Sequence, residues 1–79
     1  MYVKMHYINE AENAFERGGI IDRVTIDGFR AARSVAREAT DQPDDVLADL
    51  HDDNGDIVDV LCFSRQMRDR VVAAMRPTN

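Results

Sequence analysis

Cysteine is almost absent from this sequence, since Cys62 is the only one in 79 residues. A single cysteine excludes an intramolecular disulfide and any multi-cysteine metal site. Its position in an apolar stretch predicts a buried, unreactive thiol. We expect no cofactor and no metal ion. A chain this small is marginally stable on its own, so oligomerisation or partner binding would be one source of extra stability.

Long apolar runs are missing as well. No stretch approaches the roughly 20 apolar residues that span a bilayer. The first ten residues, MYVKMHYINE, lack the apolar core of a signal peptide. The hydrophobic fraction of 44% is ordinary for a globular protein. We therefore expect residues 1–79 to form a single compact domain in the cytoplasm, without membrane contact.

Motifs that carry catalysis are also missing. His6 and His51 are the only histidines, and neither stands in a constellation of metal ligands or acid–base partners. Ser64 is better explained as a helix cap than as a nucleophile. The aspartate-rich segment around Gly55 is not an EF-hand, because apolar residues occupy two positions that require carboxylates. We predict that the protein is not an enzyme.

What the sequence does contain is a β-hairpin signal at Val46–Phe63, where two apolar-rich runs flank Asp53-Asn54-Gly55. Gly55 suits a three-residue loop, in which a type I turn is followed by a left-handed residue. This loop predicts three apolar cross-strand pairs on one face: Leu50 with Val58, Ala48 with Val60, and Val46 with Cys62. A two-residue loop would place Leu50 opposite Asp59, since a one-residue slip exchanges the faces of a strand. The three-residue loop is therefore favoured.

The rest of the chain predicts two more strands and two helices. Residues 9–19 are ambiguous between a short helix, at about 10–17, and a long loop. The order is ββαββα, which predicts an α+β fold with two helices on one face of a small antiparallel sheet. The expected elements are a strand at or near the sheet edge over Tyr2–Ile8, a strand over Ile20–Ile26, a helix capped by Asp27 that runs to about Ala39, and a helix capped by Ser64 over Arg65–Met75.

The strongest chemical signal is a run of aspartates between residues 41 and 59, where no Lys or Arg occurs. Turn chemistry explains several of them, but strands disfavour Asp49 and Asp59. In the predicted register these two share one face and lie close enough to repel. We interpret the run as an acidic surface for a protein partner with a basic surface. The predicted partner-binding residues are Asp41, Asp44, Asp45, Asp49, Asp52, Asp53, Asp56 and Asp59.

A second charged feature is the stripe Arg30, Arg33 and Arg37 on one face of the expected helix. It is either a solvated face or an alternative partner-binding site, which would make the protein a small regulator that contacts nucleic acid or an acidic partner. A third hypothesis is a dimeric, antitoxin-like subunit that uses the mixed face of the hairpin to form a homodimer. The net charge of −5 argues against nonspecific nucleic-acid binding, so no direct DNA binding is expected.

A compact, acidic, single-domain α+β chain without a catalytic motif resembles the phage-encoded anti-CRISPR inhibitors. Several of those proteins cover the DNA-binding surface of a CRISPR effector complex. The resemblance implies a non-enzymatic inhibitor that masks a basic, nucleic-acid-binding surface on an effector subunit, in the host cytoplasm. The aspartates of residues 41–59 carry the resemblance. No residue role transfers, because these families share no motif.

Overall fold

The structure is a computed structural model that describes residues 1–8 and 19–76. The short helix expected at about residues 10–17 lies outside these ranges. The α+β fold is confirmed, with a four-stranded antiparallel sheet and two helices. The elements are strands β1 (Tyr2–Tyr7), β2 (Ile20–Ile21), β3 (Val46–His51) and β4 (Ile57–Phe63), helices α1 (Ile26–Ala36) and α2 (Arg68–Met75), and a 3₁₀ turn, η1 (Arg65–Met67), that leads into α2.

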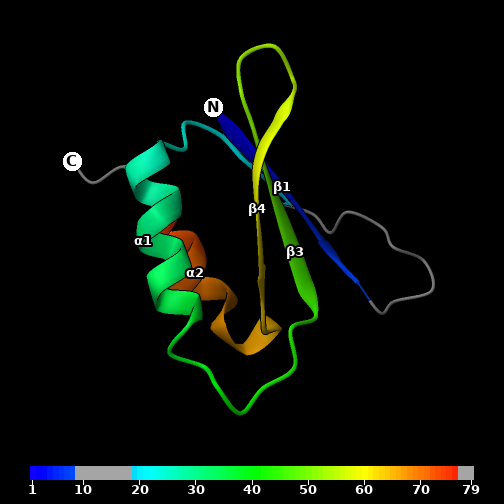
Figure 1. Cartoon of the computed structure of the whole chain (residues 1–79), viewed down its shortest axis with the longest axis vertical. Helices are drawn as coiled ribbons and strands as arrows, with labels where there is room; N and C mark the ends of the chain where they lie inside the picture. Colours follow the sequence, from blue (N-terminus) through cyan, green and yellow to red (C-terminus); the bar gives the residue numbers. More distant parts are fainter. Residues whose placement is uncertain (9–18, 77–79) are drawn as a thin grey trace.

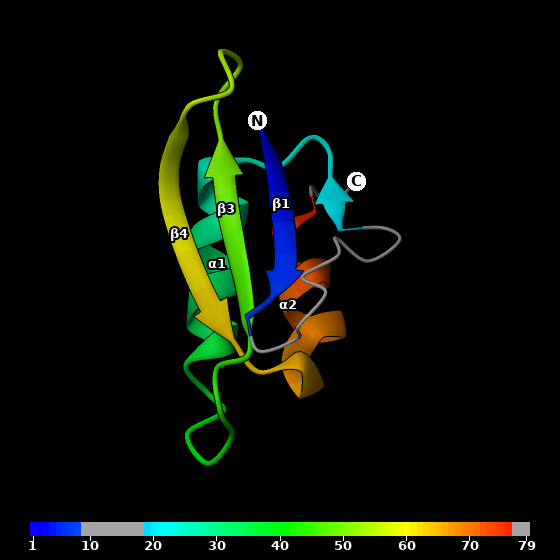
Figure 2. The same cartoon turned by 90° about the vertical axis from the view of Figure 1, so that its right-hand side faces the viewer.

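The sheet has the strand order β2-β1-β3-β4, and each neighbouring pair is antiparallel. Strand β1 is next to the edge strand β2, which agrees with the near-edge alternative for this segment. Both helices lie on the same side of the sheet (Figure 1), and Figure 2 looks onto the opposite side. Among the described strands, β2 and the longer strand β4 lie at the two edges of the sheet.

Strand β2 is much shorter than the predicted strand over Ile20–Ile26. Arg23 has a φ of 61°, a left-handed conformation that a non-glycine residue seldom adopts and that turns the chain out of the sheet. Val24 then packs into the core with 2% of its surface exposed. Its N–H donates a hydrogen bond of 2.9 Å to the Met1 carbonyl, so the chain stays tied to β1 beyond the end of β2.

Helix α1 begins two residues earlier than predicted. Its N-cap is Thr25, whose Oγ1 accepts a hydrogen bond of 2.9 Å from the Gly28 N–H. Asp27, the expected cap, instead lies in the first turn, where its negative charge interacts favourably with the helix dipole. The helix ends at Ala36 rather than near Ala39.

The second helical segment follows the prediction closely. Ser64 caps η1 by accepting a hydrogen bond of 3.1 Å from the Gln66 N–H. Val71 and Met75 of α2 are fully buried. The two helices approach closely at Gly28, where a Cβ atom would lie 2.6 Å from the Met75 carbonyl oxygen. This position therefore has room only for glycine.

The predicted register of the β3–β4 hairpin is wrong by one residue over most of its length. His51 pairs with Ile57, but Leu50 pairs with Asp59, so Val58 has no partner in the ladder and forms a bulge. The bulge exchanges the faces of the rest of β4. Leu61 and Phe63 enter the core, where they are 5% and 1% exposed. They bury more apolar surface than the valines and cysteine of the predicted register.

Candidate functional site

The three-residue loop at the hairpin tip is confirmed. Gly55 has a φ of 86°, and its N–H donates a hydrogen bond of 3.0 Å to the Asp52 carbonyl, which closes the type I turn. The Asp52 carboxylate accepts hydrogen bonds from the N–H groups of Asn54 and Asp56, at 2.9 and 3.0 Å. Asp52 therefore shapes the tip in addition to carrying charge there.

Asp45 also forms an internal contact. Its Oδ2 lies 2.7 Å from Arg65 Nε, and its Oδ1 accepts a hydrogen bond of 2.7 Å from the Arg65 N–H. Partial burial raises the pKa of the Asp45 carboxyl, but the hydrogen bonds and charge of Arg65 outweigh it and hold the pKa below its ordinary value. This contact joins the start of β3 to the start of η1, so Asp45 acts as a structural residue.

Asp59 forms the third internal contact of the aspartate run. Its Oδ2 lies 2.8 Å from Arg33 Nη2 on α1. Asp59 pairs with Leu50 across the sheet, whereas Asp49 pairs with Val60. The expectation that Asp49 and Asp59 share one face is therefore wrong, and the predicted repulsion between them does not arise. The bulge at Val58 is the cause, because it turns Asp59 toward the helices.

The remaining aspartates fall into three places along the hairpin. Asp41 and Asp44 are exposed in the loop before β3, Asp49 lies in the middle of β3, and Asp53 and Asp56 are exposed at the tip. Figure 2 shows that loop and the tip at opposite ends of the sheet. The Asp53 side chain is 96% exposed, although Oδ1 lies 3.5 Å from the N-terminal ammonium group. The acidic residues thus border the sheet at both ends and do not form one patch.

The three arginines of the stripe also differ in their contacts. Arg33 contacts Asp59 and also donates a hydrogen bond of 3.0 Å to the Val60 carbonyl. Arg30 lies 4.0 Å from Asp27, and both side chains are largely exposed. Arg37 is exposed beyond the end of α1. The central arginine is thus held by the protein itself, which leaves two separated cations on this face.

The sheet face opposite the helices carries a mixed surface that extends the predicted mixed face of the hairpin over all four strands. One row of cross-strand neighbours runs over all four strands, from Ile20 through Lys4 and Asp49 to Val60. Ile20 is 55% exposed and Val60 is 47% exposed. The opposite charges of Lys4 and Asp49 are neighbours in the middle of this row. No described helix covers this face (Figure 2). Its remaining members are Tyr2, His6, Leu47, His51, Ile57 and Cys62.

His51 joins this open face to the hairpin tip. Its ring stacks on Tyr2, with centroids 4.8 Å apart and an angle of 2° between the planes. His51 Nδ1 lies 3.0 Å from the Gly55 carbonyl oxygen, to which it can donate a hydrogen bond. The residue is 8% exposed. These contacts hold the acidic tip in a fixed position relative to the sheet.

Cys62 is exposed on the open face, so the prediction of a buried thiol is wrong. The bulge is again the cause, because it exchanges the positions of Cys62 and Phe63. Partial burial raises the pKa of the Cys62 thiol, and the nearby charges of Asp44 and Asp49 raise it further. The thiol is therefore accessible but weakly ionised at neutral pH.

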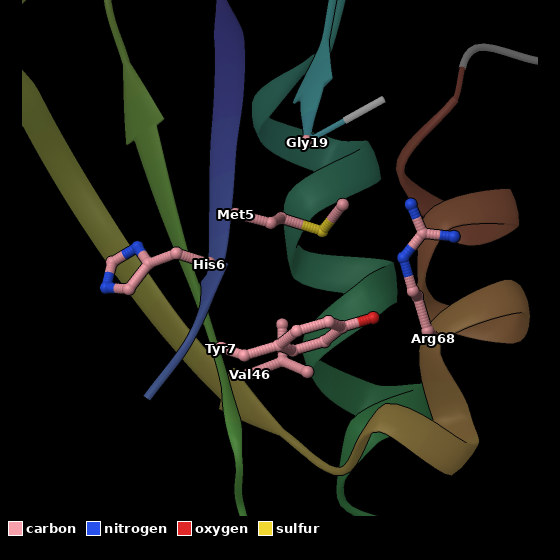
Figure 3. A pocket seen from close by; sticks show the side chains of 6 residues that line it. All are labelled: Met5, His6, Tyr7, Gly19, Val46 and Arg68. Carbon is pink, nitrogen blue, oxygen red and sulfur yellow. The ribbon is translucent and has the colours of Figure 1, made fainter. Parts of the chain in front are cut away.

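A small cavity lies between β1 and α2 (Figure 3), and its volume of about 10 Å³ is room for one water molecule. Figure 3 shows Met5 and Tyr7 pointing toward α2, where Arg68 lies, while His6 points away. No group of three or more potential metal-ligating side chains occurs within residues 1–8 and 19–76. This cavity is too small to hold a substrate.

The chain matches no protein-family model, no curated protein and no solved structure. Within the described ranges, no helix has the length and apolar character needed to cross a membrane.

Proposed function

We propose that this protein is a non-enzymatic inhibitor that masks a basic, nucleic-acid-binding surface of a protein partner, as the resemblance to anti-CRISPR inhibitors of CRISPR effector complexes implies. The observation that carries the proposal is the open face of the sheet. It exposes Ile20 and Val60 on its two edge strands, with Leu47 partly exposed between them, and exposed carboxylates border it at both ends. Exposed apolar side chains next to charged groups are typical of a protein–protein interface.

The charge of the rim indicates the chemistry of the partner. Among the described residues, no Lys or Arg forms an ion pair with Asp41, Asp44, Asp53 or Asp56. A surface that binds nucleic acid carries clustered Lys and Arg side chains, and these would complement the two acidic borders. Complementary charges steer association and raise its rate. Duplex DNA itself has the wrong sign for this surface.

The test uses purified CRISPR effector complexes, loaded with guide RNA and mixed with labelled target DNA. We expect the wild-type protein to reduce DNA binding by at least one effector type, measured by fluorescence anisotropy. The double variant Asp49→Asn with Asp53→Asn should fold normally and associate with that effector about tenfold more slowly at low salt, because charges at an interface act mainly on the association rate.

The matched control is Asp22→Asn with Asp69→Asn. It removes the same amount of charge from exposed positions outside the hairpin, so it should inhibit like the wild type. Equal losses in both variants would show a nonspecific effect of net charge. No inhibition of any effector type would contradict the anti-CRISPR assignment.

A further inference from the structure

Strand β4 forms one edge of the sheet (Figure 2), and both backbone groups of Val60 are bonded to side chains rather than to another strand. The Val60 N–H donates a hydrogen bond of 2.8 Å to Asp59 Oδ1. The Val60 carbonyl accepts one of 3.0 Å from Arg33 Nη2. Arg33 and Asp59 also form an ion pair with each other, at 2.8 Å. The three contacts form a closed arrangement at the middle of the free edge.

This arrangement occupies the positions that a neighbouring strand would use. In an antiparallel ladder, alternate residues exchange both their N–H and their C=O bonds with one residue opposite. Here the Asp59 carboxylate replaces the acceptor of such a residue, and the Arg33 guanidinium replaces its donor. An incoming strand therefore has to displace both side chains before it can pair with Val60.

The edge would otherwise favour pairing with another strand. Val58 and Val60 are 51% and 47% exposed, and long edge strands with exposed apolar side chains pair readily with other chains. The best-matched partner is β4 of a second copy. When two such strands are related by a two-fold axis at Val60, each Val60 supplies the donor and the acceptor that the other requires.

We propose that Arg33 and Asp59 form an edge guard, which closes β4 against pairing with β4 of a second copy and keeps the protein monomeric. The guard competes well with a second β4 strand for the Val60 N–H and carbonyl, because its two side chains are part of the same molecule as Val60. It is also displaceable, since the Arg33 and Asp59 side chains are 30% and 46% exposed and exposed ion pairs are weak. The inference concerns the edge of the sheet and does not depend on the partner proposed for its open face.

The test removes the guard without a change in net charge. In the variant Arg33→Met with Asp59→Ala, both groups that bond Val60 are lost. We expect the wild type to sediment as a monomer, and we expect this variant to form a dimer with a dissociation constant at least about tenfold lower. The matched control is Arg30→Met with Asp27→Ala on the same helix. It removes the same residue types without any contact to the β4 backbone and should remain monomeric.

A third variant locates the dimer interface. Adding Val60→Pro to the guard-free variant removes the N–H that pairs across the two-fold axis, and proline is tolerated on an edge strand. We expect this change to restore the monomer. If the guard-free variant unfolds, Asp59→Ala alone frees the Val60 N–H while Arg33 keeps its position over the Phe29 ring, 5.6 Å from its centroid, and this variant should form a weaker dimer that Val60→Pro dissociates.

Three results would overturn the proposal. The first is a wild-type protein that already dimerises and becomes monomeric with Val60→Pro, because the guard would then not close the edge. The second is a folded guard-free variant that stays monomeric at every concentration tested. The third is a guard-free dimer that Val60→Pro does not dissociate, which would place the interface on another surface.

Discussion

Two aspartates of the same acidic run, Asp45 and Asp53, have different roles because their neighbours differ. The Asp45 side chain is 16% exposed and bonded twice to Arg65. The Asp53 side chain is 96% exposed. The partner of Asp45 lies 20 residues further along the chain, so no local pattern distinguishes a structural aspartate from a surface one. Only the fold separates them.

For this reason Asp45→Asn should lower the free energy of unfolding by about 1–3 kcal/mol at neutral pH, because a partly buried, charge-assisted contact is lost. The pKa of Asp45 is lower in the folded protein than its ordinary value. Its contribution is therefore fully present above about pH 4 and is lost as the pH falls through the lowered pKa. Urea unfolding should show a difference between wild type and variant that shrinks toward low pH. Asp53→Asn is the control and should leave stability nearly unchanged, and a difference that grows in acid would contradict this account.

Cys62 gives a second test at the same scale. We expect thiol reagents to label Cys62 in the native protein, because the side chain is exposed. Labelling should be slower than that of a free cysteine at neutral pH, since burial and two aspartates raise the thiol pKa and the thiolate is the reacting form. Asp44→Asn with Asp49→Asn should speed labelling but not restore the rate of a free cysteine, because the effect of burial on the thiol pKa remains. Labelling that proceeds only at the rate of global unfolding would instead support the register that pairs Cys62 with Val46.

At the scale of elements, the sequence predicts the hairpin and its turn but not the bulge that follows. Gly55 indicates the three-residue loop, because the last residue of this loop needs a positive φ and glycine adopts it readily. The bulge at Val58 has no such marker. It depends on long-range gains, namely the burial of Leu61 and Phe63 and the contact between Asp59 and Arg33. Because one extra residue exchanges the faces of a strand, this single omission also misplaced Cys62 and Asp59.

The contact between the two helices provides the prediction for this scale. Gly28→Ala adds a Cβ that would lie 2.6 Å from the Met75 carbonyl oxygen. Alanine favours a helix by up to about 1 kcal/mol over glycine, but a backbone atom cannot move away easily. We therefore expect a net loss of about 1–3 kcal/mol, which is typical of overpacking. Ser34→Ala, at an exposed position of the same helix, is the control for helix propensity and should be neutral or slightly stabilising. A stabilised Gly28→Ala variant would show that the helices can separate at this point.

At the scale of the whole molecule, the order of elements was predictable, but the full extent of the open face was not. Apolar periodicity indicated both helices and the strands they cover, and Ser64 marked the start of the second helical segment. The open face, in contrast, arises from residues of all four strands, such as Ile20, Lys4, Asp49 and Val60. These residues are far apart in the sequence, and only strand pairing brings them into one row. The aspartate run was visible in the sequence, but its division into internal contacts and exposed borders depends on Arg33 and Arg65.

The negative net charge of the protein leads to the final prediction, which distinguishes the proposed mask from a nucleic-acid-binding regulator. With a net charge of −5, and with Arg33 held by Asp59 and the Val60 carbonyl, we expect no measurable binding of duplex DNA at physiological salt. Phosphate contacts by Arg30 and Arg37 would instead give an affinity whose logarithm falls steeply and linearly with the logarithm of salt concentration.

The measurement is a titration of labelled duplex DNA at several salt concentrations. It compares the wild type with two variants, Arg30→Gln with Arg37→Gln and Asp53→Asn with Asp56→Asn. Wild-type binding that the glutamine variant abolishes would assign function to the arginine face and contradict the acidic mask. Absence of binding in all three proteins would contradict the nucleic-acid-binding regulator.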